Sequence, residues 1–201
     1  LLDSVVEKYQ VKTDDILDFG CGHGRVARHL RLAFPHSRLS FSDIDDSGWQ
    51  FCASEFNGMG FPSAPEFSEL KIPGKYDLIW LGSVFTHLDW DRSVQLLTQL
   101  ASSLKPQGVV VATVRGKACY ETMVNNPGRF NIGGYYDQLL NEYKKSGFGY
   151  MDYKDFKDWG QHLINPANLS KLAKDSNSQL LEVVEQGWAN IHDVAVFSAS
   201  E

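Results

Sequence analysis

Two strongly apolar segments, Tyr76–Leu81 and Val109–Val114, constrain the fold of this 201-residue chain more than any other feature. Neither alternates between apolar and polar residues, which indicates strands buried on both faces, as in a parallel sheet covered by helices on each side. Between them, apolar residues recur every three or four positions in Ser93–Leu104, and Lys105–Gly108 then supplies a proline and a glycine that stop the helix. The order strand, helix, strand predicts an α/β fold.

The same alternation continues on both sides of these segments. Further strands are expected at Ile16–Phe19, at Leu39–Ser42, briefly within 56–74, at Leu180–Val184 and at Asp193–Ser198, with helices around Val26–Leu30 and over Ser47–Glu55. The first five strands predict a doubly wound, mostly parallel sheet, and the last two predict a C-terminal antiparallel hairpin. The length and the 43% hydrophobic content suit a single domain, residues 1–201. Ligands of such sheets bind at the carboxyl ends of the parallel strands.

Residues 116–166 interrupt this regularity after the fifth strand. The segment is rich in aromatic residues and glycines, and an irregular insertion at the ligand edge of a sheet is typical of a mobile lid. Tyr135 and Tyr136 follow the pair Gly133-Gly134 within it. Their rings suit either stacking on a ligand or packing in a small core of the lid, and we favour the core.

Charge and cysteine content narrow the possible partners. There are 25 acidic and 19 basic residues, a net charge of -6, which argues against binding nucleic acid by bulk electrostatics. The three cysteines form no C-x-x-C pattern, and no spacing of His, Cys, Asp and Glu predicts a metal site. No apolar run reaches the roughly 20 residues that span a bilayer, and no signal-peptide pattern follows Leu1. We therefore expect a cytoplasmic protein without a membrane span.

A glycine-rich loop, DFGCGHGR at residues 18–25, directly follows the first predicted strand. Glycines at that point permit a tight turn and let a ligand approach the main-chain N–H groups near a helix N-terminus. The spacing is G-x-G-x-G, and Arg25 stands where a dinucleotide fingerprint needs its third glycine. This loop also lacks the Lys-Ser/Thr ending of a nucleoside triphosphate loop. A pyrophosphate site is therefore disfavoured, whereas a turn chosen only for packing stays possible.

The second predicted strand ends at Asp43, next to the glycine loop in a parallel sheet. A carboxylate at this position can accept both hydroxyls of a ribose. Asp43 taken alone suits a helix N-cap at least as well. Together, the loop and the carboxylate predict a nucleoside pocket that needs no phosphates.

Four segments in order resemble the motifs of class I S-adenosylmethionine-dependent methyltransferases: DFGCGHGR at 18–25, DIDDSGWQFC at 43–52, YDLIWLGSVFTHL at 76–88 and KPQGVVVAT at 105–113. The resemblance covers residues 11–115 and implies a Rossmann-like methyltransferase fold with S-adenosylmethionine as cofactor. It also implies a set of cofactor-binding residues: Asp18 at the amino end, Gly20, Cys21 and Gly22 along the methionine part, Gly24 and Arg25 completing the loop, Asp43 at the ribose, Ile44 against adenine, and Leu81, Gly82 and Ser83 beside the sulfonium. Many relatives carry an acid after the third strand that meets the adenine amino group, and here only GFPSA at 60–64 is found.

The later segments SGFGYMDYKDFKDWG at 146–160, INPANL at 164–169 and GWANIHDV at 187–194 are similar to methyltransferase domains of sugar and cell-surface glycan synthesis. This similarity implies a small-molecule or glycan acceptor that is methylated at oxygen.

Methyl transfer from a sulfonium mainly requires alignment of the nucleophile with the methyl group, but a hydroxyl acceptor usually also needs a base. Histidine is the side chain whose ordinary pKa suits that task. His192 would lie at the rim of the acceptor pocket if the terminal hairpin returns from the ligand edge, and Asp193 would then point to the opposite side. His87 follows the sulfonium wall, and His162 lies within the insertion. Each also suits a structural role: a turn cap, a helix start, or a partner of a backbone carbonyl.

The leading interpretation is therefore a methyltransferase that modifies an acceptor oxygen. Two alternatives stay open: a catalytically silent domain that binds S-adenosylmethionine, and, less favoured because of Arg25, a nicotinamide-dependent oxidoreductase.

Overall fold

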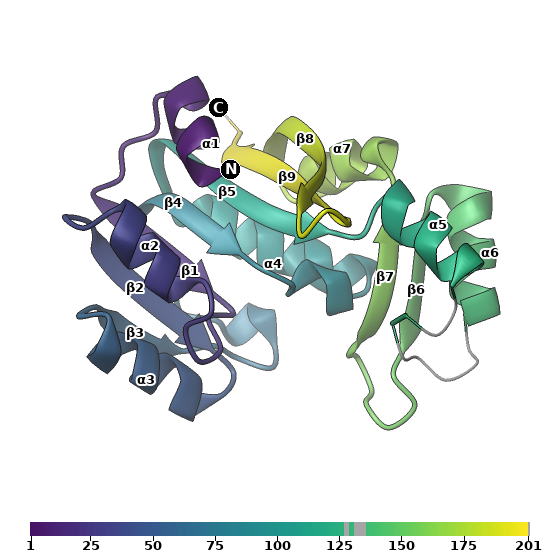
Figure 1. The fold of residues 1–201 in the computed structure, drawn as a ribbon, viewed down its shortest axis with the longest axis horizontal. Helices are drawn as coiled ribbons and strands as arrows, with labels where there is room; N and C mark the ends of the chain where they lie inside the picture. The colour runs from purple at the N-terminus through teal and green to yellow at the C-terminus, as the bar shows by residue number, and fades with distance from the viewer. Residues whose placement is uncertain (127–128, 131–135, 201) are drawn as a thin grey trace.

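The computed structural model describes residues 1–126, 129–130 and 136–200, and it contains one large and one small sheet (Figure 1). The large sheet has seven strands in the order β3-β2-β1-β4-β5-β9-β8, and the small sheet pairs β6 with β7. The strands are β1 Asp15–Phe19, β2 Arg38–Asp43, β3 Met59–Pro62, β4 Tyr76–Leu81, β5 Leu104–Val114, β6 Phe148–Asp152, β7 Gly160–Ile164, β8 Ser178–Trp188 and β9 His192–Ala199. Strands β1 to β5 pair in parallel, whereas β9 runs antiparallel to both β5 and β8. The predicted doubly wound sheet with a terminal antiparallel hairpin is confirmed.

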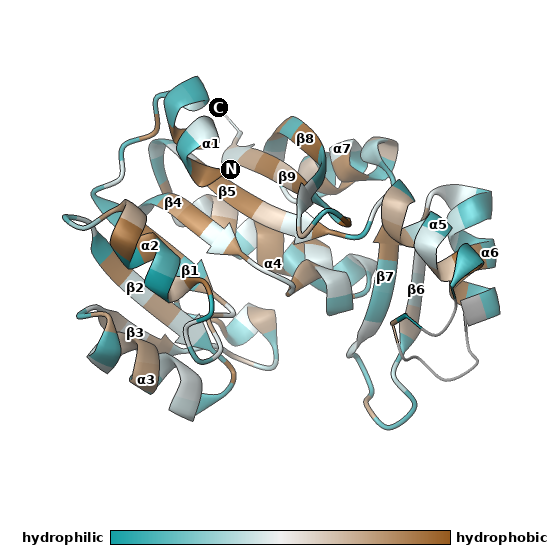
Figure 2. Ribbon diagram, in the orientation of Figure 1, coloured by the Kyte–Doolittle hydropathy of each residue, from teal (hydrophilic) through white to brown (hydrophobic). Residues whose placement is uncertain are grey.

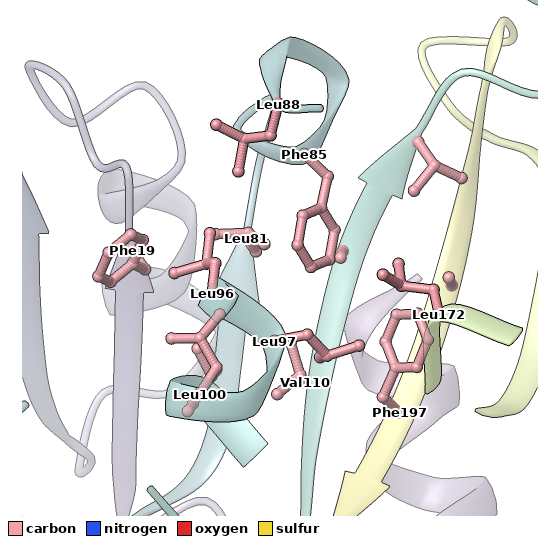
Figure 3. Packing of buried hydrophobic residues seen from close by; sticks show 14 of the residues in the cluster. Phe19, Leu81, Phe85, Leu88, Leu96, Leu97, Leu100, Val110, Leu172 and Phe197 are labelled. Atoms are coloured by element: carbon pink, nitrogen blue, oxygen red, sulfur yellow. The ribbon is translucent and has the colours of Figure 1, made fainter. Parts of the chain in front are cut away.

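Helices cover both faces of the large sheet. They are α1 Leu2–Tyr9, α2 Ala27–Ala33, α3 Asp46–Glu55, α4 Trp90–Ser102, α5 Lys117–Asn125, α6 Tyr136–Ser146 and α7 Pro166–Asp175, with 3-10 turns η1 Phe67–Glu69 and η2 Phe85–His87. Buried side chains of α1, α2 and α3 pack on one face, and those of α4 and α7 pack on the other. Figure 3 shows the second of these cores, in which Leu96 and Leu97 of α4 lie between Leu81 of β4 and Phe197 of β9.

Burial follows the apolar pattern of the strands. Every residue of β4 is buried, and so are all seven residues of β5 from Gly108 to Val114. The apolar stretches of both strands are brown in Figure 2. Helix starts follow capping rules, because the carboxylate of Asp45 accepts the Ser47 N–H in α3 and that of Asp89 accepts the Arg92 N–H in α4. These local devices fix the helices that frame the carboxyl edge of the sheet.

Two predicted boundaries were wrong. Helix α4 begins three residues before Ser93, and β5 begins at Leu104 instead of Val109. The strand starts early because Leu104 already pairs with Tyr76 of β4, before the register between the two strands shifts at Tyr76–Leu78. The Lys105 ammonium also forms an ion pair with the Asp77 carboxylate at 2.8 Å. The residues expected to end the helix therefore lie inside the strand.

The insertion was expected to be irregular, and this too was wrong for the residues the structure describes. Helices α5 and α6 and the hairpin β6–β7 occupy it and enclose a small core of their own, beside the carboxyl end of β5 (Figure 1). This core contains Cys119, Met123, Leu139, Leu163 and Ile191. Gly133, Gly134, Tyr135 and the side chain of Tyr136 lie outside the described residues. Helices α1 and α7 were not predicted, and the two terminal strands are longer than expected.

Candidate functional site

A cavity of about 590 Å³ opens at the carboxyl ends of β1, β2 and β4. Its size suits a nucleoside-sized ligand or a small cofactor. The lining residues are Phe19, Gly20, Arg25, Asp43, Ile44, Ser63, Ala64, Pro65, Phe67, Gly82, Ser83, Val84, His87, Arg92 and Trp159. Six of the residues singled out for cofactor binding are among them: Gly20, Arg25, Asp43, Ile44, Gly82 and Ser83.

The glycine loop is tied to β2 by its backbone. The N–H groups of Gly20 and Cys21 donate to the Ser42 carbonyl at 2.8 and 3.1 Å, and the Gly22 N–H donates to Asp43 Oδ2 at 2.7 Å. Gly20 and Gly22 have φ values of +77° and +49°. A Cβ on Gly20 would lie 2.4 Å from Val84 Cγ2, so this position also excludes a side chain for lack of space.

Asp43 does not cap the following helix, because Asp45 does. The Oδ2 atom of Asp43 holds the glycine loop, and its Oδ1 accepts the Asp45 N–H at 3.0 Å. Its backbone carbonyl accepts the Ser63 N–H at 2.9 Å, which brings the residues after β3 to the same wall. Each carboxylate oxygen can accept more than one hydrogen bond, so Asp43 retains acceptor capacity toward the cavity that it lines.

Asp18 is buried below the loop, with 2% of its surface exposed. Burial, and secondly the charge of Asp43, raise the pKa of its carboxyl to about 7. Its Oδ2 atom has no hydrogen-bond partner among the described residues, and neither has the indole Nε1 of Trp80, its cross-strand neighbour. A buried acceptor of this kind suits a cationic or hydrogen-bonding group of a ligand.

Three other residues of the expected set shape the loop and do not line the cavity. Leu81 is fully buried in the core beneath it. Cys21 is buried, and burial is the main cause that raises the pKa of its thiol. Gly24 has no Cβ, which leaves room for the Phe56 ring. A Cβ at this position would lie 2.5 Å from Phe56 Cε2.

His87 lies on the opposite wall, at the end of η2. Its Nδ1 is 2.8 Å from the Gly160 carbonyl oxygen and 3.0 Å from the Tyr153 hydroxyl, and its ring stacks on Trp159 with centroids 4.7 Å apart. Burial, followed by the charge of Arg115, lowers the pKa of the imidazole to about 4. His87 is therefore neutral at pH 7 and able to accept a hydrogen bond.

His192 and His162 are placed differently. His192 opens β9 and is not among the residues lining this cavity; both its ring nitrogens are buried without a partner among the described residues. Burial and then Arg115 lower its pKa to about 4. As expected, Asp193 does not hold it, because that carboxylate accepts the Gln186 N–H at 2.9 Å. His162 is buried with Nδ1 donating to the Leu88 carbonyl at 3.0 Å, which is its structural role.

Comparisons with known proteins agree with this geometry. Residues 17–110 match a family described as "Methyltransferase domain". Over this part, just under half of its length, the chain is similar to the class I S-adenosylmethionine-dependent methyltransferases. A malonyl-[acyl-carrier protein] O-methyltransferase of Calditerrivibrio nitroreducens is 28% identical over 118 residues, 58% of this chain and 44% of that protein. An N-terminal Xaa-Pro-Lys N-methyltransferase of Danio rerio is 29% identical over 116 residues, 54% of this chain and 49% of that protein.

A solved structure extends the similarity of fold over the whole chain. An S-adenosylmethionine-dependent methyltransferase from Clostridium acetobutylicum superposes with a TM-score of 0.70 at 16% identity, covering 100% of this chain and 89% of that one. In contrast, the chain spans less than half the length of each of the two curated relatives.

The cofactor of this family, S-adenosylmethionine, fits the residues present. The unpartnered Asp18 oxygen suits its ammonium, and Asp43 suits its ribose hydroxyls. Ile44 exposes 62% of its surface at the rim, which suits a flat adenine ring. Among the described residues, no cluster of three or more His, Cys, Asp or Glu side chains could hold a metal ion, and no helix there is long and apolar enough to cross a membrane.

Several cavity residues were missed by sequence reasoning. Arg92 lies in the first turn of α4, one residue before the predicted helix start, and Trp159 lies in the loop between β6 and β7. Their positions depend on contacts between segments 66 residues apart, because Arg92 Nη1 donates to the Asp158 carbonyl. No local pattern in the sequence marks either residue.

Proposed function

We propose that this methyltransferase transfers the methyl group of S-adenosylmethionine to an oxygen atom of a small-molecule or glycan acceptor. One observation carries the proposal: the glycine loop, Asp43 and His87 face a single cavity at the carboxyl edge of the sheet. The cofactor, when bound, supplies a methyl group already activated by the positive sulfonium. The protein then has to bind it, orient the acceptor and receive the acceptor's proton.

The binding roles follow from the contacts around the loop. Asp43 accepts the ribose hydroxyls while it holds the Gly22 N–H, so ribose recognition and loop geometry depend on the same carboxylate. Asp18 receives the ammonium, whose charge lowers the raised pKa of the carboxyl and keeps it ionised. Gly82 and Ser83 flank the reacting methyl group, where the Ser83 N–H is held by Thr113 Oγ1 at 2.7 Å.

His87 is the group that we place at the acceptor's proton. It lines the cavity, whereas His192 does not, and this is why we favour His87 of the two candidates. With a pKa of about 4, His87 is a weak base. It takes the hydroxyl proton late in the reaction, when bond formation to the methyl group has made that proton more acidic. His192 stays the second candidate, because it lies near enough to His87 and Arg25 for both to influence its pKa.

Charge favours oxygen over nitrogen as the methylated atom. Arg25 and Arg92 line the cavity against one acid, Asp43, and Arg115 acts on both histidines. An amine acceptor arrives as an ammonium ion, which such surroundings repel, whereas a hydroxyl arrives neutral. The cytoplasmic location and the single-domain organisation expected above belong to the same proposal.

Two measurements separate this function from its alternatives. Calorimetry should detect S-adenosylhomocysteine binding and no comparable binding of NAD; the reverse result would favour an oxidoreductase. Turnover of S-adenosylmethionine should then appear with at least one hydroxyl compound in an acceptor panel. Cofactor binding with no turnover on any acceptor would favour a silent binding domain.

Histidine variants test the proton acceptor. His87→Ala should lower turnover about 10²- to 10⁴-fold and leave cofactor affinity within about twofold, because the residue acts on the acceptor. His192→Ala is the matched comparison. Loss of turnover only in His192→Ala would transfer the role to that residue, and full turnover in both variants would mean that alignment alone carries the reaction.

A further inference from the structure

Among the described residues, the two polar groups that contact the His87 ring both belong to one inserted element, the hairpin β6–β7. The Gly160 carbonyl and the Tyr153 hydroxyl approach the same ring nitrogen, Nδ1, at 2.8 and 3.0 Å. Trp159 stacks on the ring with an interplanar angle of 19°. These residues lie 66 to 73 positions from His87 in the sequence.

The partners of Nδ1 define where the imidazole carries its proton. A carbonyl oxygen only accepts hydrogen bonds, so Nδ1 carries the hydrogen and donates it to Gly160. The Tyr153 hydroxyl lies beside this bond and accepts the Gln161 Nε2 hydrogen at 3.3 Å. A neutral imidazole protonated at Nδ1 has its lone pair on Nε2. The hairpin therefore leaves Nε2 as the atom able to accept a proton.

The loop between the two strands is itself closed and anchored. The Tyr153 N–H donates to the Trp159 carbonyl at 3.0 Å, which closes the loop. Arg92 donates through Nη1 to the Asp158 carbonyl and through Nη2 to the Pro65 carbonyl at 2.6 Å. One guanidinium thus ties this loop to the segment after β3 across the cavity mouth.

Gly160 has to be a glycine for this arrangement. A Cβ there would lie 1.9 Å from the Met151 carbonyl oxygen on β6, so any side chain would push the two strands apart. The Gly160 carbonyl would move with them.

We propose that Tyr153 and Trp159 are positioning residues that hold His87 in the Nδ1–H tautomer with Nε2 free toward the acceptor. The inference rests on the proposed function in one respect, the use of His87 as proton acceptor. The tautomer and the orientation are properties of the folded chain that can be measured without any acceptor.

The experiment is a long-range ¹⁵N–¹H correlation spectrum of the full chain with ¹⁵N-labelled histidine rings, bound to S-adenosylhomocysteine. His87→Gln assigns the His87 signals. We expect a protonated Nδ1 and an unprotonated Nε2 at pH 7. Tyr153→Phe and Trp159→Ala should move the signals toward a mixture of tautomers, and Trp159→Phe, which keeps a stacking ring, should restore most of the original pattern.

Tyr150→Phe is the matched control. Tyr150 is on the same hairpin, but its hydroxyl donates to Asp152 Oδ1 at 2.6 Å and not to His87. This variant should keep the spectrum and the turnover of the original chain. With an active acceptor, Tyr153→Phe and Trp159→Ala should lower kcat about 10- to 100-fold while the dissociation constant of S-adenosylhomocysteine stays within about twofold.

The outcomes separate this inference from the proposed function. A protonated Nε2 in the original chain, or a tautomer unchanged in both variants, overturns the positioning roles. A tautomer that changes in the variants while turnover stays constant supports the positioning roles and removes His87 as the proton acceptor.

Discussion

The two walls of the cavity are built by different physical means. On the β1–β2 side, the wall is made of glycine-loop backbone and the Asp43 carboxylate, which are hydrogen-bonded to each other and to the end of β2. On the β6–β7 side, it is made of the rings of His87 and Trp159, which are held by carbonyls and by one arginine. The first wall is fixed by hydrogen bonds between the glycine loop and β2. The second depends on a loop that Arg92 anchors and on the contacts of that loop with His87, so the two walls should respond differently to substitution.

Substitution in the glycine loop should have the largest effect. Gly22→Val should weaken S-adenosylhomocysteine binding at least about 10³-fold, because branched carbons would enter the open space in which we propose that the cofactor approaches the loop backbone. Calorimetry measures the effect. No atom lies within 4 Å of a Cβ at Gly22, so the fold should lose only the cost of its positive φ, about 1–2 kcal/mol.

Gly74→Val provides the matched control. Gly74 also has a positive φ, +89°, with open space around its Cβ, but it lies away from the cavity. Its loss of stability should be similar and its binding unchanged. If Gly22→Val binds S-adenosylhomocysteine as tightly as Gly74→Val does, the glycine loop is only a turn and not part of the binding site.

Asp18→Asn tests the buried carboxyl of the same wall through pH. The pKa is raised from 3.8 to about 7, so the folded chain keeps a proton that the unfolded chain releases as the pH rises between these values. This group therefore makes the cofactor-free protein less stable as the pH rises from about 4 to 7.

The asparagine variant should remove that dependence. The free energy of unfolding of Asp18→Asn minus that of the original chain should increase by about 2–4 kcal/mol from pH 4 to pH 8. Urea denaturation measures both values. The variant's affinity for S-adenosylhomocysteine should fall, because the ammonium loses its carboxylate. A difference in stability that does not change with pH would contradict the raised pKa.

Asp43→Ala should weaken S-adenosylhomocysteine binding by about 1.5–3 kcal/mol, because it removes a charged acceptor from two hydroxyls. Asp45→Ala is the comparison two residues away. It removes the cap of α3 and should cost about 1 kcal/mol of stability with little change in binding. Equal dissociation constants for Asp43→Ala and the original chain would take Asp43 out of the site.

The smallest effect is expected on the second wall. Arg92→Met should speed amide hydrogen exchange in residues 153–159 about 5- to 10-fold, because the Asp158 carbonyl loses its bond to a guanidinium that is itself held by the Pro65 carbonyl. Lys157→Met removes a charge from the same loop without touching this anchor and should leave exchange unchanged. Equal exchange in both variants would mean that Arg92 does not hold the loop. Whether residues 116–166 act as a mobile lid is measured in the same experiment, by adding cofactor.

The sequence alone determined the parallel sheet, the terminal hairpin and most of the β1–β2 side of the cavity. Apolar runs, glycine spacing and the carboxylate of Asp43 are local features, since each fixes backbone conformation or burial within a few residues. The boundary between α4 and β5 was missed because pairing of Leu104 with Tyr76 outweighed the local helix stop.

Only the tertiary structure decided the second wall. Nothing near His87 in the sequence indicates that its Nδ1 donates to a carbonyl 73 residues away, or that Trp159 covers its ring. These contacts depend on the register of β6 with β7 and on the close approach of Met151 that only a glycine at position 160 allows. The same holds for His192, which the sequence placed at the rim of the acceptor pocket but which the fold leaves off the lining of this cavity. Contacts between distant segments follow from packing of the whole chain, which no periodicity of residues encodes.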